Sequence, residues 1–144
     1  MNLTSKDGWM TELQWRPRYE LGIPLIDEQH KRIFFLLNQL QKAVTDRHAR
    51  EEVEAILSGL MRQTSEHFHT EETFMKQMQF PGLEQHRVQH SKLLDGLFGL
   101  EARFKEGDTS MAMLVTTFLG SWLRHHIHEG DRIYADFLAN VEKT

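Results

Sequence analysis

Residues 50–78, REEVEAILSGLMRQTSEHFHTEETFMKQM, decide the fold of this chain. Apolar side chains recur along the stretch at steps of three and four residues, which is the period of one face of an α-helix. Two polar residues, His67 and Glu71, fall in the same line as the apolar ones. The whole line is Val53, Ile56, Leu60, Thr64, His67, Glu71, Phe74 and Met78. The pattern predicts a long helix with an imidazole and a carboxylate on its buried face.

Other segments on both sides repeat the helical period. A first helix is expected to open at Gly22-Ile23-Pro24, because proline suits an early helical position, and its inner line includes Leu25. Phe80-Pro81-Gly82 ends the helix over 50–78, since proline lacks an amide hydrogen and glycine tolerates the turn. The remaining helices are expected at about 83–105, 110–128 and 131–142.

Long helices with short connections predict an all-α fold, an antiparallel up-down-up-down four-helix bundle with a short C-terminal helix. At 144 residues, the chain has the length of a single domain, 1–144. We divide it into an N-terminal arm, 1–22, and the helical bundle, 23–144. Trp9, Trp15 and Tyr19 indicate that the arm packs on the bundle.

The composition excludes several classes of protein. There is no cysteine, which rules out disulfides, thiolate metal sites and cysteine nucleophiles. A net charge of −4 gives no general attraction to nucleic acid or to an anionic membrane. No apolar run approaches the roughly 20 residues that span a bilayer, and the start MNLTSKDGWM does not read as a secretory signal. We therefore expect a cytoplasmic protein with no nucleic-acid partner and no membrane insertion.

Polar residues with metal-ligand chemistry fall on the inner faces of all four long helices. A buried imidazole or carboxylate without a partner is costly, and a satisfied core histidine explains one such residue but not six. Some of them are spaced four apart, so that they share one helical face. Imidazole and carboxylate suit iron, zinc, manganese or copper, so the ligand types leave the metal open. The six residues are His30, His67, Glu71, His86, His90 and His126.

Asp131 is a further candidate ligand, five residues after His126. Five residues on a regular α-helix turn the side chain about 140° away from the same face. Asp131 can point inward only if the helix ends or bulges there, and Gly130 permits either.

The ordered set of candidate ligands resembles the hemerythrin family. The resemblance extends from about Trp15 to the C-terminus, and the length is similar to that of a single-domain bacterial hemerythrin. The matching runs are Ile26-Asp27-Glu28-Gln29-His30, His67-Phe68-His69-Thr70-Glu71-Glu72, His86-Arg87-Val88-Gln89-His90, Trp122-Leu123 and His126-Ile127-His128-Glu129-Gly130-Asp131.

The resemblance implies a cofactor of two iron ions joined by a bridging oxide or hydroxide. One position would stay open on the iron with two histidines, where O2 would bind. The implied ligands are His86, His90 and His126 on one iron, His30 and His67 on the other, and Glu71 and Asp131 as bridges. The apolar residues expected near the O2 position are Ile33, Phe68, Trp122, Leu123 and Ile127; ordinary core packing explains them equally well.

The function implied by the resemblance is reversible O2 binding for storage, or for delivery to a respiratory enzyme, without catalysis. Two alternatives stay open: an oxygen or redox sensor acting through a signalling partner, and a di-iron enzyme that handles peroxide or nitric oxide. The enzyme would need a proton donor near the open position, and Tyr134, one turn after Asp131, is the candidate. A zinc-stabilised bundle is disfavoured because structural zinc sites usually have four ligands.

Other polar residues are expected to stay outside the site. Glu66 and His69 form one Glu-x-x-His pair, whereas ferritin-like di-iron sites need two such pairs. His125 and His128 flank His126 but point to other faces, so we expect them in solvent. Glu72 is expected to point outward, to a salt bridge or to contact with a ligand.

Overall fold

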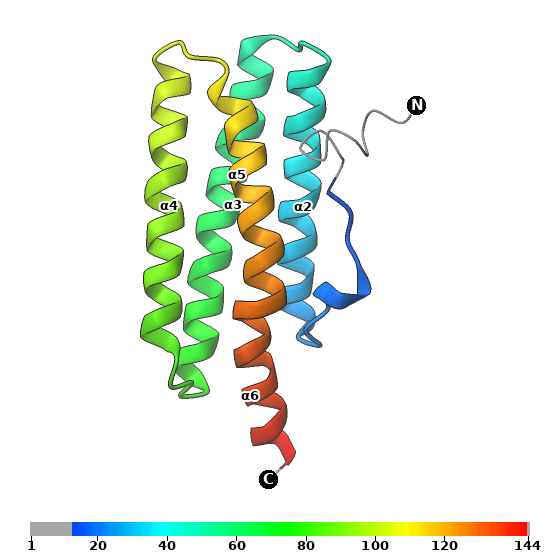
Figure 1. Cartoon of the computed structure of the whole chain (residues 1–144), viewed down its shortest axis with the longest axis vertical. Helices are drawn as coiled ribbons and strands as arrows, with labels where there is room; N and C mark the ends of the chain where they lie inside the picture. Colours follow the sequence, from blue (N-terminus) through cyan, green and yellow to red (C-terminus); the bar gives the residue numbers. More distant parts are fainter. Residues whose placement is uncertain (1–12, 144) are drawn as a thin grey trace.

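The computed structural model describes residues 13–143 and confirms the predicted all-α four-helix bundle. Figure 1 shows four long helices side by side, each running opposite to the one before it. Helix α2 contacts α3, α3 contacts α4, α4 contacts α5, and α5 closes the ring against α2. No strand occurs within the part of the chain that the structure describes. The bounds are α2 Pro24–Thr45, α3 Arg50–Gln77, α4 Leu83–Lys105 and α5 Met111–His125.

The ends of α2, α3 and α4 agree closely with the prediction, but the inner face of α2 differs by one residue. Pro24 is the first residue of α2, and α4 ends before Gly107, whose φ of 118° favours glycine. Leu25, predicted to face inward, is 60% exposed, whereas Ile26 is buried. The prediction was wrong because Ile26 lies four residues before His30 and shares its face, while Leu25 lies five before it.

The N-terminal arm packs on α2, as Trp15 and Tyr19 predicted. Both rings pack against Phe34, and their centroids lie 5.2 Å and 5.4 Å from that of the Phe34 ring. Upstream, the Leu13 amide donates to Asn38 Oδ1 at 2.8 Å, and Asn38 Nδ2 donates back to the Leu13 carbonyl at 2.7 Å. The arm is therefore joined to α2 by aromatic packing and by hydrogen bonds. Trp9 lies outside the described residues.

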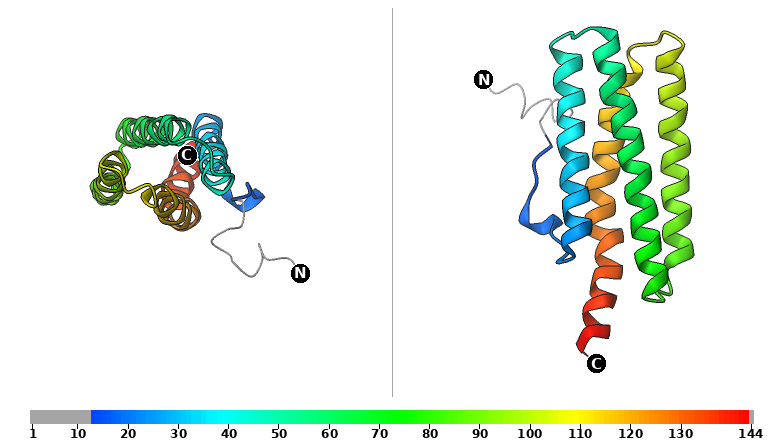
Figure 2. Two further views of the ribbon diagram at one scale, coloured as in Figure 1. Left: turned by 90° about the horizontal axis from the view of Figure 1, so that it is seen from above. Right: turned by 180° about the vertical axis from the view of Figure 1, so that it is seen from behind.

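The last helix does not stop near Gly130. A π-helical segment, η3 (His126–Asp131), continues α5 directly into α6 (Arg132–Lys143), which extends past the end of the bundle (Figures 1 and 2). A π-helix bonds residues five apart, so His126 and Asp131 lie one turn apart on one face. Of the two possibilities, a helix end or a bulge, the structure contains the bulge.

The core has an apolar half and a polar half. At the end where α2 leads into α3, the inner faces carry only apolar side chains such as Leu40, Leu57, Phe104 and Val115, all at most 1% exposed. The other end collects the polar residues, because antiparallel helices bring the starts of α2 and α4 beside the ends of α3 and α5. No helix within residues 13–143 is long and apolar enough to cross a membrane.

Candidate metal centre

Seven potential metal ligands lie buried at the polar end of the core. None is more than 7% exposed, and five of them are exposed by 1% or less. Helices α2, α3 and α4 contribute five of them, and the π-helical segment that continues α5 contributes the last two. The residues are His30 from α2, His67 and Glu71 from α3, His86 and His90 from α4, and His126 and Asp131 from η3.

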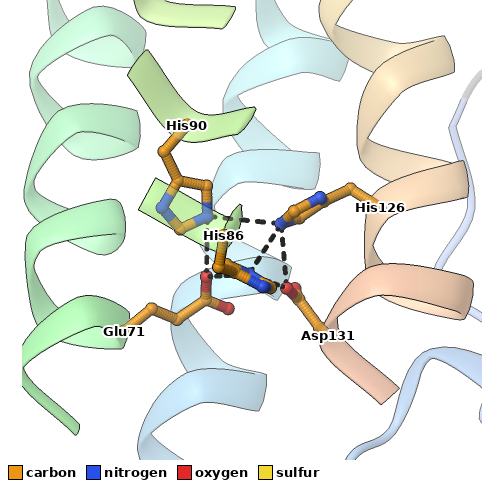
Figure 3. Close-up of side chains that lie close together, drawn as sticks. All are labelled: Glu71, His86, His90, His126 and Asp131. Carbon is orange, nitrogen blue, oxygen red and sulfur yellow. Dashed lines mark hydrogen bonds and ion pairs between the residues drawn. The ribbon is translucent and has the colours of Figure 1, made fainter. Parts of the chain in front are cut away.

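The ligand atoms form two groups that share Glu71. One group joins three imidazoles to both carboxylates, and its ligand atoms all lie within 4.8 Å of one another. Figure 3 shows these five side chains pointing toward one another from α3, α4 and η3. In the other group, the ligand atoms of His30, His67 and Glu71 also lie within 4.8 Å of one another.

The Glu71 carboxylate presents a different oxygen to each group. Oε1 lies 3.1 Å from His90 Nε2 and 3.6 Å from His86 Nε2. Oε2 lies 3.3 Å from His67 Nε2 and 3.4 Å from His30 Nε2. A carboxylate with one oxygen toward each of two ligand groups is oriented as a bridge between two cations.

Asp131 repeats this arrangement. Its Oδ1 lies 2.8 Å from His86 Nε2 and 2.9 Å from His126 Nε2, and its Oδ2 lies 3.2 Å from His30 Nε2. The π-helical turn makes this possible, because a regular α-helix would carry the Asp131 side chain away from the cluster.

The unpaired buried atoms fit a cation. Among the described residues, His30 Nε2, His67 Nε2, Glu71 Oε1 and Asp131 Oδ2 have no hydrogen-bond partner, although all four are inaccessible to solvent. Burying such atoms unpaired is costly, and coordination of a cation would satisfy them. Imidazole nitrogens and carboxylate oxygens are ligands that iron accepts, so the residues present suit the group that the sequence resemblance implied.

The carboxylates are ionised. Burial alone would raise the pKa of the Glu71 and Asp131 carboxyl groups, but the surrounding histidines hold both pKa values below their ordinary range. Conversely, burial alone would lower the pKa of His30 and His86, and their close contacts with the Asp131 and Glu71 carboxylates raise each pKa to about 9. The cluster therefore offers two negative charges to a cation, which would displace protons from the imidazoles.

Three residues outside the predicted set contact the candidate ligands. Gln29 Oε1 accepts a hydrogen bond from His67 Nδ1 at 2.7 Å, and Glu72 Oε2 accepts one from His90 Nδ1 at 2.8 Å. The Tyr134 hydroxyl donates to Glu71 Oε2 at 2.8 Å.

The signals for these contacts in the sequence are incomplete. Gln29 was missed as a contact, whereas Glu72 makes both the salt bridge, with Arg87, and the contact with a ligand, His90, that were expected of it. Both residues adjoin a predicted ligand, which on an α-helix turns the side chain about 100° toward a neighbouring helix. Tyr134 was noted only as a possible proton donor. This adjacency to a ligand is the signal that could have found Gln29 and Glu72.

Two of the five apolar residues expected around O2 stack on candidate ligands. The Phe68 ring stacks on His90 with centroids 3.8 Å apart, and the Trp122 ring stacks on His126 at 4.0 Å. Ile33, Leu123 and Ile127 are buried. Trp122 is half-buried and also lines an apolar surface groove of about 730 Å³ between α4 and α5. The role of these five residues around O2 stays a prediction.

His125 and His128 were expected in solvent, and both are exposed. Glu66 and His69, which form the single ferritin-like pair, are exposed as well. Exposed His48 lies 2.9 Å from Glu52. The fold and the buried cluster together define a class: a helical-bundle protein with a candidate histidine–carboxylate metal centre.

Comparison with known proteins identifies the family. The model of the Hemerythrin HHE cation binding domain matches residues 21–138, and the chain belongs to the hemerythrin family. A bacteriohemerythrin of Stenotrophomonas maltophilia is 32% identical over 88% of this chain and 82% of its own length. One from Methylococcus capsulatus is 30% identical, with 82% and 89% covered. Family membership indicates a non-haem iron centre that binds oxygen.

Proposed function

We propose that the seven buried residues hold two iron ions with a bridging oxide or hydroxide, and that the protein binds O2 reversibly for storage or delivery. The observation that carries this proposal is the orientation of Glu71 and Asp131. Each carboxylate turns one oxygen to the three-histidine group and the other to His30 of the second group. Two carboxylates that each face two groups of ligands fit a site for two cations better than a site for one.

The unequal number of histidines supports O2 binding at one ion. His86, His90 and His126 would hold the first iron, and His30 with His67 would hold the second. The iron centre, when bound, supplies the electrons and the open coordination position that O2 requires. The protein's own contribution is to fix both ions by residues on rigid helices and to leave the second ion with one protein ligand fewer.

The surroundings favour reversible binding over an enzymatic reaction. Phe68 is buried and stacks on His90, and Leu123 is a buried apolar residue; apolar side chains of this kind would keep water away from the ions. The Tyr134 hydroxyl, the candidate proton donor, already donates a hydrogen bond to Glu71 Oε2 at 2.8 Å. Burial and the adjacent Glu71 charge raise its pKa well above the ordinary value of 10.0, so it holds its proton. Bound oxygen would therefore leave as O2 rather than as a protonated product.

The test is an optical titration of anaerobically reduced, iron-loaded protein. We expect two irons per chain, a visible charge-transfer band that appears in air, and loss of that band under argon. A stable oxidised form that does not revert under argon would contradict reversible binding and favour sensing or peroxide chemistry. A chain that cannot load two irons would contradict the ligand assignment.

Neighbouring histidines provide a matched pair of variants. His126 is buried within the cluster, whereas His125 beside it is exposed. We expect His126→Ala to load less than two irons per chain and to lose the oxygen-dependent band, and His125→Ala to keep both. Equal behaviour of the two variants would refute the role assigned to His126.

A further inference from the structure

Two of the candidate ligands make hydrogen bonds to chemically different acceptors on the side of the ring that faces away from the cluster. His67 and His90 both turn Nε2 toward the cluster, and each makes a hydrogen bond through Nδ1 on the far side of its ring. The acceptor for His67 is the neutral amide oxygen of Gln29, at 2.7 Å. The acceptor for His90 is the Glu72 carboxylate, at 2.8 Å. Amide and carboxylate oxygens only accept, so both Nδ1 atoms carry the proton.

The charged and the neutral acceptor belong to different ligand groups. The three-histidine group, through His90, contacts a full negative charge. In the other group, His67 contacts a neutral dipole, and His30 Nδ1 has no hydrogen-bond partner among the described residues. Hydrogen bonds to a charged acceptor are roughly twice as strong as neutral ones, so the two groups differ in electrostatics as well as in ligand number.

A carboxylate behind a metal-bound imidazole makes that imidazole a more basic ligand. A more basic ligand stabilises the higher charge of an oxidised ion and so lowers its reduction potential. We propose that Glu72 and Gln29 are positioning residues that set the order of oxidation in the centre. The iron held with His90 loses its electron first, and the iron held with His67 loses its electron second. This inference rests on the di-iron centre proposed above.

Arg87 provides an internal check on the role of charge. Its Nε lies 3.4 Å from Glu72 Oε1, and its Nη1 lies 2.6 Å from Glu84 Oε1. The guanidinium therefore offsets part of the Glu72 charge. Arg87→Gln should strengthen the effect of Glu72, whereas Glu72→Gln removes it. Because Arg87 is 43% exposed, salt should screen its contribution, and the effect of Arg87→Gln should be small above about 1 M salt.

The experiment is an anaerobic spectroelectrochemical titration of the iron-loaded protein. Each of its two steps transfers one electron from an Fe2+ ion to the electrode and leaves Fe3+. We expect Glu72→Gln to raise the potential of the first step, and Gln29→Glu to lower the potential of the second. Both substitutions therefore narrow the gap between the steps. An effect of about tenfold in the electron equilibrium, at the lower end for such supporting contacts, corresponds to about 59 mV.

Glu66→Gln is the matched control, because it removes the same charge from the same helix at an exposed position. It should leave both potentials unchanged, and iron content is measured for every variant. The inference is refuted if Glu72→Gln and Gln29→Glu leave the gap as in the parent, or if Glu72→Gln moves both steps equally. If Glu72→Gln fails to load iron, the potentials of Gln29→Glu alone decide whether the inference holds.

Failure of this inference and failure of the proposed function are distinguishable. The potentials are measured without O2, whereas reversible binding is read from the air and argon cycle. If the difference between the two potentials narrows as expected but the protein does not release O2, only the proposed function is refuted. If the protein binds and releases O2 but the difference between the potentials is unchanged, only the proposed order of oxidation is refuted.

Discussion

Gly130 lies against the ring of a candidate ligand, and Gly130→Ala tests how closely the π-helical turn fits the metal centre. A Cβ atom built on Gly130 would lie 3.0 Å from His126 Nδ1 and 3.3 Å from its Cε1. The φ angle of Gly130 is not in the left-handed region, so alanine itself is conformationally allowed. Only the His126 ring stands in the way of the added methyl group.

The size of the expected loss of iron affinity depends on how the His126 ring can make room for the methyl group. The His126 ring stacks on Trp122 at 4.0 Å and lies 3.0 Å from His86 through Nε2, so it can give only by turning away from its preferred rotamer. A turn of about 30° costs on the order of 0.5–1.5 kcal/mol. We therefore expect iron affinity to fall by up to about tenfold. The iron-free fold gains about 0.5–1 kcal/mol from alanine in a helical segment, which offsets the strain there.

The assay measures two quantities for the same variant: iron affinity by competition with a chelator, and the free energy of unfolding of iron-free protein in urea. Gly99→Ala is the control, since a Cβ at Gly99 meets nothing within 4 Å. It should stabilise the fold by about 0.5–1 kcal/mol and leave iron affinity unchanged. Parental iron affinity in Gly130→Ala would refute the reasoning, because it would mean that the ring does not need its position.

Three further outcomes are expected. Tyr134→Phe should lower the free energy of unfolding of iron-free protein by about 1.5–3 kcal/mol in urea, because the buried Glu71 carboxylate loses its hydroxyl donor; an unchanged value would contradict that. Leu123→Ala should open the apolar surroundings and speed loss of the oxygenated form, followed optically, and an unchanged rate would count against its predicted place near O2. The pKa of His30 and of His86 is raised from 6.5 to about 9, so this stabilisation is complete below pH 6.5 and is lost as the pH rises through 9. Urea unfolding of iron-free protein between pH 6.5 and 9.5 should show that decline, and a rise would refute the sign.

The bundle was predictable because helical period and helix stops are local properties. Phe80-Pro81-Gly82 and Pro24 determine where helices end and begin whatever the tertiary contacts are. The exact inner face of α2 was less predictable, because Leu25 and Ile26 are both apolar and either can continue the line. Only the position of His30 in the cluster selects Ile26, and that is a tertiary fact.

The candidate ligands were predictable as a set, but which ligand each supporting residue contacts was not. Polar residues at core positions stand out in a sequence, and His67 with Glu71 is such a case. Gln29 and Glu72 look like ordinary surface residues, because they lie beside the inner line rather than in it. Whether each reaches a ligand ring depends on the separation of neighbouring helices. That separation is set by the packing of the whole core and not by the local sequence.

The buried polar end links folding to metal binding. Atoms such as His30 Nε2, His67 Nε2 and Asp131 Oδ2 are buried without a hydrogen bond among the described residues, and ion-pair contacts of 3.2 Å and 3.3 Å offset only part of their desolvation cost. A cation that coordinates them removes the cost, and its binding free energy then adds to the stability of the fold. A substitution in the cluster therefore changes two free energies, which can have opposite signs. Only variants measured both with and without iron separate a ligand that binds metal from a side chain that merely fills the core.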